Sequence, residues 1–438
     1  MKTPISDFID RYIESKASRF HMPGHKGVGE IEKYDITEIA GADVLYSATG
    51  IIEESENNAA ELFGTAHSYY STEGSTLAIK AMLFLASKGK SKTILAARNV
   101  HKAFVYGCAL LDLKTEWIYP REFSHLCSCK ITAEDVENKL SEMKELPCAV
   151  YVTSPDYLGN IADIKGISDV CKDAGVPLIV DNAHGAYLNF IDPSLHPIAL
   201  GAAMCTDSAH KTLPVLTGGA YLHISKDYSE YCDNARNALS LFASTSPSYL
   251  IMRSLDLCNE YMEKAFKKEL TECIEKIDEV KDNFSSLGIP VENSEPLKIV
   301  INANKMGYTG DDLGDILREC GIEAEFCDCE YIVLMPSPKN TDEDFRLLTE
   351  AFEKIEKKAP ITPLTLAPAH AKQVMTAREA VFSPHEKVSV DLAKDRICAS
   401  PSVSCPPAVP IAVSGEVIGE KEIALFKYYG ITEVEVVK

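Results

Sequence analysis

The stretch CAVYVTSPDYLGNIADIKGISDVCKDAGVPLIVDNA, residues 148–183, decides the fold. It opens with an apolar run, passes through an amphipathic segment that ends at Gly175, and closes with the apolar run VPLIVDNA at 176–183. Glycine favours the end of a helix at this point, because it adopts left-handed backbone conformations without strain. A strand, a helix and a second strand in this order predict two parallel strands joined by a crossover helix.

The same alternation continues on both sides of this stretch. Thr132 is placed to cap a helix over 132–146, and Asp135 favours the first turn of that helix. Further β-branched and apolar runs predict strands at 92–97, 115–120 and 219–225. We therefore expect an α/β domain with a mainly parallel sheet and helices on both faces. Ligands of such sheets bind beyond the carboxyl ends of the strands.

The character of the sequence changes after residue 255. A long charged helix with an apolar stripe is predicted over 256–288, followed by strands at 297–303 and 331–337 and helices at 310–319 and 342–357. A proline-rich junction at 357–370 leads to a segment at 398–418 that is typical of short strands and turns. These changes predict four parts: an N-terminal arm (1–35), a large domain (36–255), a small α+β domain (256–360) and a C-terminal domain (361–438).

The bulk composition excludes several classes of partner and location. The 438 residues are 46% hydrophobic and carry a formal net charge of −21, so we expect neither a nucleic acid nor an anionic membrane as partner. No apolar run is long enough to span a membrane and no signal peptide is evident, which predicts a cytoplasmic protein. The 14 cysteines include no C-x-x-C pair, so neither a disulfide nor a metal site is predicted.

Three His-Lys dipeptides raise the question of which lysine reacts. They are His25-Lys26, His101-Lys102 and His210-Lys211. Only Lys211 follows, at an interval of 30 residues, an acid that ends an apolar strand, namely Asp181. We therefore expect Lys211 to be the reactive lysine and the other two lysines to play no chemical part.

Other polar residues accompany this lysine. Gly74, Ser75 and Thr76 begin an apolar helix, where free N–H groups form an anion site, and the ring of His101 follows a strand. An anion site, a flat ring, an acid and a lysine are what pyridoxal 5′-phosphate (PLP) requires, because the lysine forms a Schiff base and the acid keeps the pyridine nitrogen protonated. Taken singly, each feature has an ordinary alternative: a helix cap, a loop histidine or a structural buried acid.

Several blocks of sequence follow one another in the order known from one enzyme family. They are FHMPGHKG (20–27), the segment 35–76, RNVHKAF (98–104), TSPDYLGNIADI (153–164), DNAHGA (181–186), DSAHKTLPVLTGGA (207–220), STSPSYLIMRSLD (244–256) and the segment 377–418. Together they resemble the Orn/Lys/Arg decarboxylases, and most of all the short form of that family. The resemblance implies the α/β fold of the aspartate-aminotransferase-like PLP enzymes (fold type I), with a small α+β domain and an appended C-terminal domain.

The resemblance also implies residue roles. Lys211 is the Schiff-base lysine, Asp181 the partner of the pyridine nitrogen, and His184 a neighbour of the Schiff base. The cofactor-binding residues that it adds are Gly74, Ser75, Thr76, His101, Ser208, His210 and Ser246. Ser246 lies in STSPSY (244–249), which in the family reaches the phosphate of the neighbouring subunit. A homodimer or larger homo-oligomer with shared active sites is therefore implied.

The implied reaction is decarboxylation of lysine, arginine or ornithine to the amine and carbon dioxide, with Lys211, His184 and Asp181 as catalytic residues. An aminotransferase or lyase of fold type I, and a catalytically silent PLP-binding protein, stay open as alternatives. Four departures from the family pattern bear on substrate choice and efficiency. Glu73 stands where Asn is more common, Asn182 where an acid is usual, Gly218 where Gln is common, and CPPAVP (405–410) where Pro-Pro-Gly-Ile-Pro is typical.

Overall fold

The computed structural model describes residues 1–438 except 122–123, 364–369 and 402–407. The chain divides into two compact units. The first unit consists of Met1–Ser91, Val136–Ser154 and Asp163–Lys268, and the second of Lys92–Asp135, Pro155–Ala162 and Glu269–Lys438. The division into four parts at residues 35, 255 and 360 stays a prediction.

The first unit is built on a sheet of five strands. They are β1 (His67–Ser71), β4 (Val150–Thr153), β5 (Leu178–Asp181), β6 (Met204–Asp207) and β7 (Ala220–Ile224), and they lie in the order β1-β7-β6-β5-β4. β5 is parallel to both of its neighbours, with Asp181 opposite Thr153 on one side and Thr206 on the other. β7 is antiparallel to β6 and to β1. Every residue of β5 is buried, which explains its uninterrupted apolar run up to Asp181.

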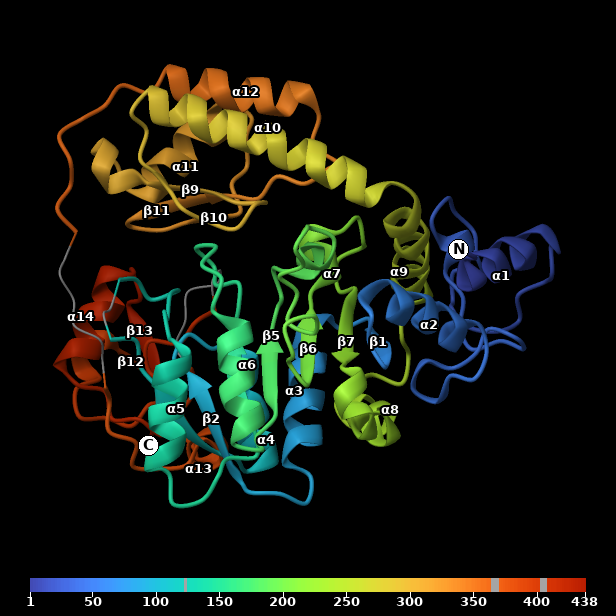
Figure 1. Ribbon diagram of the computed structural model, residues 1–438, viewed down its shortest axis with the longest axis horizontal. Coiled ribbons are helices and arrows are strands. Elements are labelled where there is room, and N and C mark those ends of the chain that lie inside the picture. The colour runs from blue at the N-terminus through green and yellow to red at the C-terminus, as the bar shows by residue number, and fades with distance from the viewer. Residues whose placement is uncertain (122–123, 364–369, 402–407) are drawn as a thin grey trace. The chain divides into compact units, whose positions relative to one another are not determined.

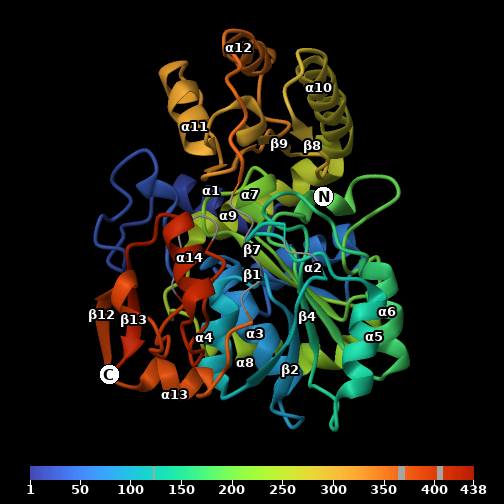
Figure 2. The same cartoon turned by 90° about the vertical axis from the view of Figure 1, so that its left-hand side faces the viewer.

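Helices cover both faces of this sheet, as Figures 1 and 2 show. α3 (Gly74–Ser87) packs against β5, β6 and β7, while α6 (Ile164–Asp173) packs against β5 from the other face. The remaining helical elements are α1 (Pro4–Glu14), η1 (Glu32–Tyr34), η2 (Leu45–Ser47), α2 (Ile51–Phe63), η3 (Ala186–Asn189), α7 (Ala209–Thr212), η4 (Lys226–Tyr231), α8 (Cys232–Ser240), α9 (Tyr249–Tyr261), η5 (Met262–Phe266) and most of α5 (Ala133–Glu142).

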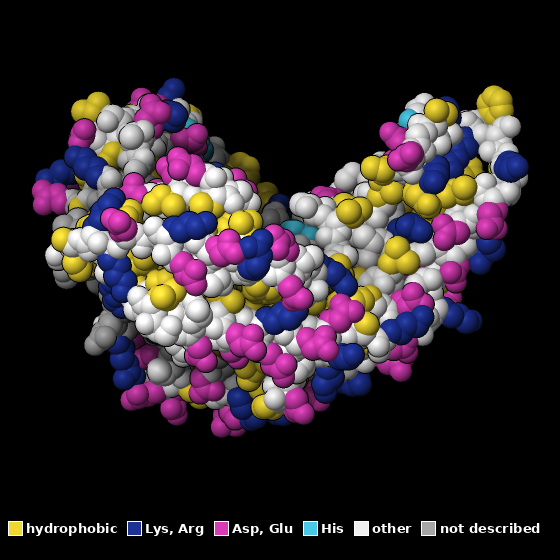
Figure 3. Space-filling model, turned by 90° about the horizontal axis from the view of Figure 1, so that it is seen from above, with side chains coloured by type: hydrophobic (Ala, Val, Ile, Leu, Met, Phe, Trp, Pro, Cys, Tyr) yellow, Lys and Arg dark blue, Asp and Glu magenta, His cyan; other side chains and the backbone are white. Residues whose placement is uncertain are grey.

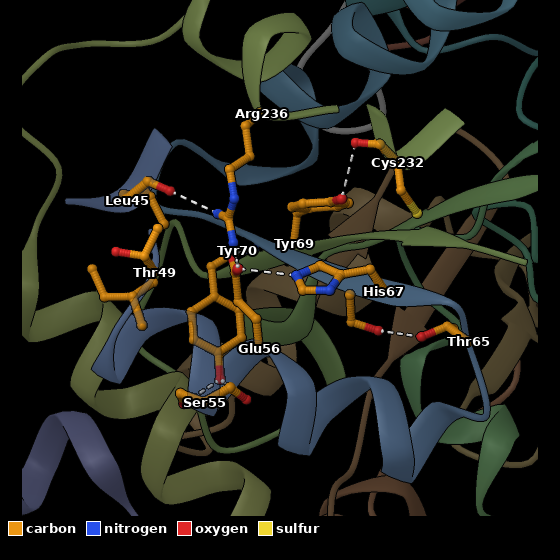
Figure 4. Close-up of polar contacts among 12 residues, drawn as sticks. Leu45, Thr49, Ser55, Glu56, Thr65, His67, Tyr69, Tyr70, Cys232 and Arg236 are labelled. Atoms are coloured by element: carbon orange, nitrogen blue, oxygen red, sulfur yellow. Dashed lines mark hydrogen bonds and ion pairs between the residues drawn. The ribbon is translucent and has the colours of Figure 1, made fainter. Parts of the chain in front are cut away.

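A buried carboxylate ties α2 and α8 to β1 (Figure 4). Glu56 accepts hydrogen bonds from the Arg236 guanidinium at 2.7 Å and the Tyr70 backbone N–H at 2.9 Å, and its Oε2 lies 3.1 Å from His67 Nε2. The Glu56 side chain is only 1% exposed, so its charge depends on these partners. The cluster therefore fixes β1, whose last residue, Ser71, leads directly into the first turn of α3.

The second unit contains three sets of paired strands. β2 (Thr93–Ala97) and β3 (Lys114–Ile118) are parallel, whereas β8 (Val291–Glu292), β9 (Ile299–Asn302), β10 (Phe326–Cys327) and β11 (Tyr331–Leu334) form an antiparallel sheet in the order β10-β11-β9-β8. β12 (His385–Ser389) and β13 (Glu433–Val437) form an antiparallel pair. The helical elements are α4 (Lys102–Leu111), most of α10 (Lys267–Ser286), η6 (Ala303–Met306), α11 (Gly310–Glu319), α12 (Asp342–Glu353), α13 (Ala377–Phe382), η7 (Val390–Leu392) and α14 (Glu420–Tyr428).

Most of the expected elements are confirmed. The runs at 92–97, 115–120, 148–154, 176–183 and 219–225 contain β2, β3, β4, β5 and β7. The long helix over 256–288 is interrupted by the π-helical turn η5, and the helix expected over 342–357 ends at Glu353. The C-terminal segment also holds two unpredicted helices, α13 and α14. Residues 364–369 of the proline-rich junction and 402–407 of the segment after it lie outside the described residues.

β1 and β6 are strands that the sequence did not predict. Their sequences, HSYYS and MCTD, are rich in polar residues, yet most of those residues are buried. The polar side chains find buried partners instead of solvent, as Ser68 does with His223 and Asp207 with Asn182. A pattern based on apolar runs therefore overlooks both strands.

The surface and the cysteines agree with the bulk composition. Acidic and basic side chains are interspersed over the face shown in Figure 3. Among the described residues, no helix is long and apolar enough to cross a membrane. The cysteines that the structure describes are free thiols, and most of them are buried.

Candidate functional site

Several predicted site residues lie on elements of the first unit that end at the carboxyl edge of its sheet. Asp181 is the last residue of β5, and β6 ends at Asp207, immediately before Ser208 and the short helix α7 that carries Lys211. Gly74 begins α3, whose chain enters from the end of β1. The sheet topology thus brings segments that are far apart in the sequence to one edge.

Asp181 is a buried acid with few partners of its own. The residue is 2% exposed, the Tyr151 hydroxyl donates to Oδ2 at 3.1 Å, and the Ala183 backbone N–H donates to Oδ1 at 3.3 Å. Burial raises the pKa of Asp181, while the Lys211 ammonium and the Tyr151 hydroxyl oppose that rise. A cation close to this carboxylate therefore decides whether it is charged.

Lys211 and His184 are in direct contact. Lys211 Nζ lies 3.1 Å from His184 Nε2, a hydrogen-bond distance between residues 27 positions apart in the sequence. His184 is buried and Lys211 is half-buried. An imidazole at this distance can take up a proton from the ammonium group, which is how a lysine becomes a neutral nucleophile.

The expected phosphate-binding residues meet where α3 begins. The Ser208 hydroxyl donates to Ser75 Oγ at 2.8 Å, and the Gly74 N–H donates to the Gly218 carbonyl oxygen at 2.7 Å. Gly74 has φ +69°, and a Cβ built on it would have no atom within 4 Å, so the space beside the two hydroxyls is open. Thr76 lies in the same turn and is exposed.

The remaining cofactor candidates lie in different surroundings. His210 Nδ1 lies 2.9 Å from the Gly219 carbonyl oxygen, which fixes the ring against the strand that follows. His101 belongs to the second unit, where it is the N-cap of α4 and Nδ1 accepts the Ala103 N–H at 3.1 Å. The stacking role of His101 therefore stays a prediction.

Glu73, one of the departures, binds the segment that carries Ser246. Glu73 Oε1 accepts the Ser244 backbone N–H at 2.7 Å, and the Ser246 N–H in turn donates to Ser244 Oγ at 3.2 Å. The anion at the start of α3 thus holds the 244–249 segment of its own chain.

Two more departures have local explanations. The Asn182 amide donates to Asp207 Oδ1 at 2.7 Å in a fully buried position, where an acid would face a second carboxylate. Gly218 has φ +98°, and a Cβ on it would lie 3.0 Å from the Thr72 carbonyl oxygen, so this backbone favours glycine. Residues 405–407 of CPPAVP lie outside the described residues.

Tyr151 is a site residue that the sequence did not reveal. It lies in the middle of β4, in an apolar run, and is fully buried. Its contact with Asp181 joins residues 30 positions apart on neighbouring strands, and nothing in the sequence of β4 signals it.

Solved structures define the class of protein. The chain aligns over 100% of its length with the constitutive lysine decarboxylase of Escherichia coli and covers 82% of that chain, with a TM-score of 0.80 at 18% identity. The lysine decarboxylase LdcF of Francisella novicida aligns with a TM-score of 0.81 at 17% identity, over 100% of this chain and 81% of its own. Serine palmitoyltransferase of Sphingomonas wittichii aligns over 80% of this chain and 82% of its own, with a TM-score of 0.57 at 14% identity. The fold is that of the fold type I PLP-dependent enzymes.

The family follows from the sequence. Residues 3–302 match the major domain of the Orn/Lys/Arg decarboxylases, and residues 346–435 match the C-terminal domain of the same family. The chain belongs to the Orn/Lys/Arg decarboxylase family and is a decarboxylase, a carbon–carbon lyase. An arginine decarboxylase of Bacillus subtilis is 29% identical over 460 residues, which cover 97% of this chain and 93% of the relative. The protein YaaO of the same organism is 28% identical over 456 residues, with the same shares.

Proposed function

We propose that the protein catalyses the PLP-dependent decarboxylation of a basic amino acid, with Lys211 as the Schiff-base lysine. The observation that carries this proposal is the contact of Lys211 with His184 in the electrostatic neighbourhood of the buried Asp181, in a chain of the Orn/Lys/Arg decarboxylase family. A half-buried lysine with an imidazole partner and a nearby acid is equipped to lose its proton and act as a nucleophile.

The residues present fit PLP. Asp181 is a buried acid that a cation must stabilise, and a protonated pyridine nitrogen is a cation of the required kind. The Ser75 and Ser208 hydroxyls come from two different elements, and the space next to Gly74 is open to a phosphate group. When bound, PLP supplies the electron sink for the electron pair that remains after carbon dioxide leaves.

The chain's own residues would then divide the work. His184 accepts the proton that Lys211 must lose, and the same pair of nitrogens is placed to return a proton to the carbon that has lost its carboxylate. Asp181 holds a cation at the end of β5, supported by the Tyr151 hydroxyl. Ser75, Ser208 and His210 would orient the phosphate, and the ring of His101 would stack on the cofactor.

Arginine is the substrate that the relatives favour. Arginine decarboxylases of Bacillus subtilis and Halalkalibacterium halodurans match 97% of this chain and are covered over 93% of their own length. The constitutive lysine decarboxylase of Escherichia coli matches only 63% of this chain and is covered over 44% of its length. We therefore expect arginine to be converted to agmatine more efficiently than lysine or ornithine is converted to its diamine.

The test is product analysis with paired lysine variants. Purified protein with PLP is offered arginine, lysine and ornithine in turn, and amine, carbon dioxide and oxo acid are measured. We expect amine and carbon dioxide in equal amounts, no activity in Lys211→Ala, and full activity in Lys102→Ala, the same change in a second His-Lys pair. An oxo acid in place of carbon dioxide would instead identify an aminotransferase. PLP binding without any product would identify a catalytically silent protein.

The proposal includes a homo-oligomer with shared active sites. The segment 20–31 exposes four large apolar side chains, Phe20 (96%), Met22 (65%), Val28 (79%) and Ile31 (67%), which a second copy of the chain would cover. Light scattering after gel filtration is expected to give at least the mass of a dimer. Phe20→Ser together with Val28→Ser is expected to shift that mass toward the monomer, whereas a monomeric wild type would contradict the proposal.

A further inference from the structure

A cluster of metal-binding side chains lies beneath the end of β6, apart from the proposed PLP-binding residues. Its members are His196, Cys205, Asp207 and His223, and all four are 0% exposed. They come from the loop before β6, from β6 itself and from β7. The proposed function uses none of them.

Their donor atoms converge on one point. Asp207 Oδ2 lies 3.0 Å from His196 Nε2 and 3.2 Å from His223 Nε2, and these atoms all lie within 4.8 Å of one another. Cys205 Sγ lies 3.9 Å from both His196 Nε2 and Asp207 Oδ1. In a tetrahedral zinc site, ligand bonds of 2.0–2.3 Å put neighbouring donor atoms about 3.3–3.6 Å apart. The four donors therefore need to move only by fractions of an ångström to surround one ion.

The framework around the cluster is rigid. Cys205 lies opposite His223 in the antiparallel register of β6 and β7, so two ligands sit on paired strands. Ser68 Oγ lies 2.7 Å from His223 Nδ1, and Thr65 Oγ1 lies 2.8 Å from Ser68 Oγ, which together turn Nε2 of the ring toward Asp207. Metal-binding histidines are usually oriented in this way, through a hydrogen bond at the other ring nitrogen.

Groups outside the four ligands support the same arrangement. The Asn182 amide donates to Asp207 Oδ1, which orients the carboxylate. The ring of Phe63 packs against both imidazoles, with centroid distances of 4.4 Å to His223 and 5.4 Å to His196. An oriented donor set inside an apolar shell is what a structural metal centre requires.

We propose that His196, Cys205, Asp207 and His223 form a structural site for a divalent zinc-like cation. Two imidazoles, a thiolate and a carboxylate are typical zinc ligands, whereas magnesium and calcium prefer oxygen donors alone. The doubly charged ion is neutralised by the thiolate and the carboxylate, so the buried site carries no net charge. The spacing of the cysteines predicted no metal site because three of the four ligands are not cysteines.

The site would stabilise the strand that leads to the reactive lysine. Asp207 ends β6, and Lys211 follows in α7. Closing β6, β7 and the preceding loop around one ion fixes the point from which α7 departs. The proposal concerns metal content and stability, so it stands independently of whether the protein is a PLP-dependent decarboxylase.

The test is the metal content of the whole protein, purified without chelators from zinc-supplemented cells. We expect about one zinc per chain in the wild type. His223→Gln and Cys205→Ser are expected to lower this to below about one fifth. The matched control is His125→Gln, which removes a buried histidine paired with Asp328 at 2.8 Å in the second unit and is expected to leave the zinc content unchanged.

A second measurement covers variants that fold poorly. Wild-type protein is unfolded with chelator, refolded with or without Zn²⁺, and melted; the zinc-loaded form is expected to melt at a higher temperature. Refolding with Co²⁺ is expected to give the visible absorption bands of a tetrahedral site, altered in Cys205→Ser. Wild-type protein without zinc after both preparations, and with the same melting temperature in both, would overturn the proposal and leave a hydrogen-bonded triad only. So would a loss of zinc in His125→Gln equal to that in His223→Gln.

Discussion

The contact between Tyr151 and Asp181 allows a quantitative prediction. Tyr151→Phe deletes one hydroxyl from a fully buried ring and keeps the packing of β4. The deleted group is the donor to Asp181 Oδ2, and it is the only side chain described as hydrogen-bonded to that carboxylate. The carboxylate loses a partner that favours its charged form, so the pKa of Asp181 rises further.

The size of the effect follows from the geometry of this bond. Hydrogen bonds to charged groups contribute about 1.5–3 kcal/mol. The O–H···O distance of 3.1 Å is long for a hydroxyl donating to a carboxylate, so the lower end applies, about 1.5 kcal/mol. This corresponds to a loss of about tenfold in kcat/KM, and to a rise of the Asp181 pKa by about one pH unit.

The assay is kcat/KM for decarboxylation as a function of pH. Asp181 must be charged for the reaction, so activity falls as the pH drops through its pKa; raising the pKa moves this acid limb to higher pH. The control is Tyr221→Phe, because Tyr221 is equally buried and its hydroxyl has no hydrogen-bond partner among the described residues. An unchanged acid limb in Tyr151→Phe, or an equal shift in Tyr221→Phe, would refute the reasoning.

Three further perturbations test other parts of the account. Glu73→Gln keeps an acceptor for the Ser244 N–H but removes a negative charge near the expected phosphate site, so PLP is expected to bind about two- to fivefold more tightly, an effect that weakens at high salt; equal affinity in a fluorescence titration would count against it. Gly218→Ala places a Cβ 3.0 Å from the Thr72 carbonyl oxygen at φ +98°, and is expected to lower the free energy of unfolding by about 1–3 kcal/mol, whereas Gly24→Ala, with open space around it, is not. Burial raises the pKa of Asp256 from 3.8 to about 6, so its proton is held more tightly in the folded state and stability falls by about 3 kcal/mol as the pH rises from 4 to above 6. Denaturant titrations of Asp256→Asn should lack this decline, and an unchanged pH dependence would contradict the assignment.

Much of the fold is visible in the sequence because its central elements are encoded locally. Gly175 has φ +69° beyond the end of α6, as its place after an amphipathic run predicts, and β5 is buried throughout, as its apolar run predicts. β1 and β6 could not be found in this way. Ser68 and Asp207 are polar residues that are buried only because their partners, His223 and Asn182, arrive from elsewhere in the chain.

The candidate site divides along the same line. The chemistry of Lys211 and Asp181 is signalled by residue type, order and resemblance. The identity of the groups that tune them depends on tertiary contacts. Tyr151 reaches Asp181 across 30 residues, and His184 reaches Lys211 across 27. The zinc-like cluster is hidden for the same reason, because its ligands follow no short spacing and meet only when β6 and β7 pair.

The most direct test of the central claim is the identity of the lysine that holds PLP. The protein is saturated with PLP, reduced with borohydride to make the linkage permanent, digested and sequenced by mass spectrometry. The account predicts one pyridoxyl group per chain, on Lys211 and on neither Lys26 nor Lys102. A pyridoxyl group on another lysine, or no modification at saturating PLP, would contradict it.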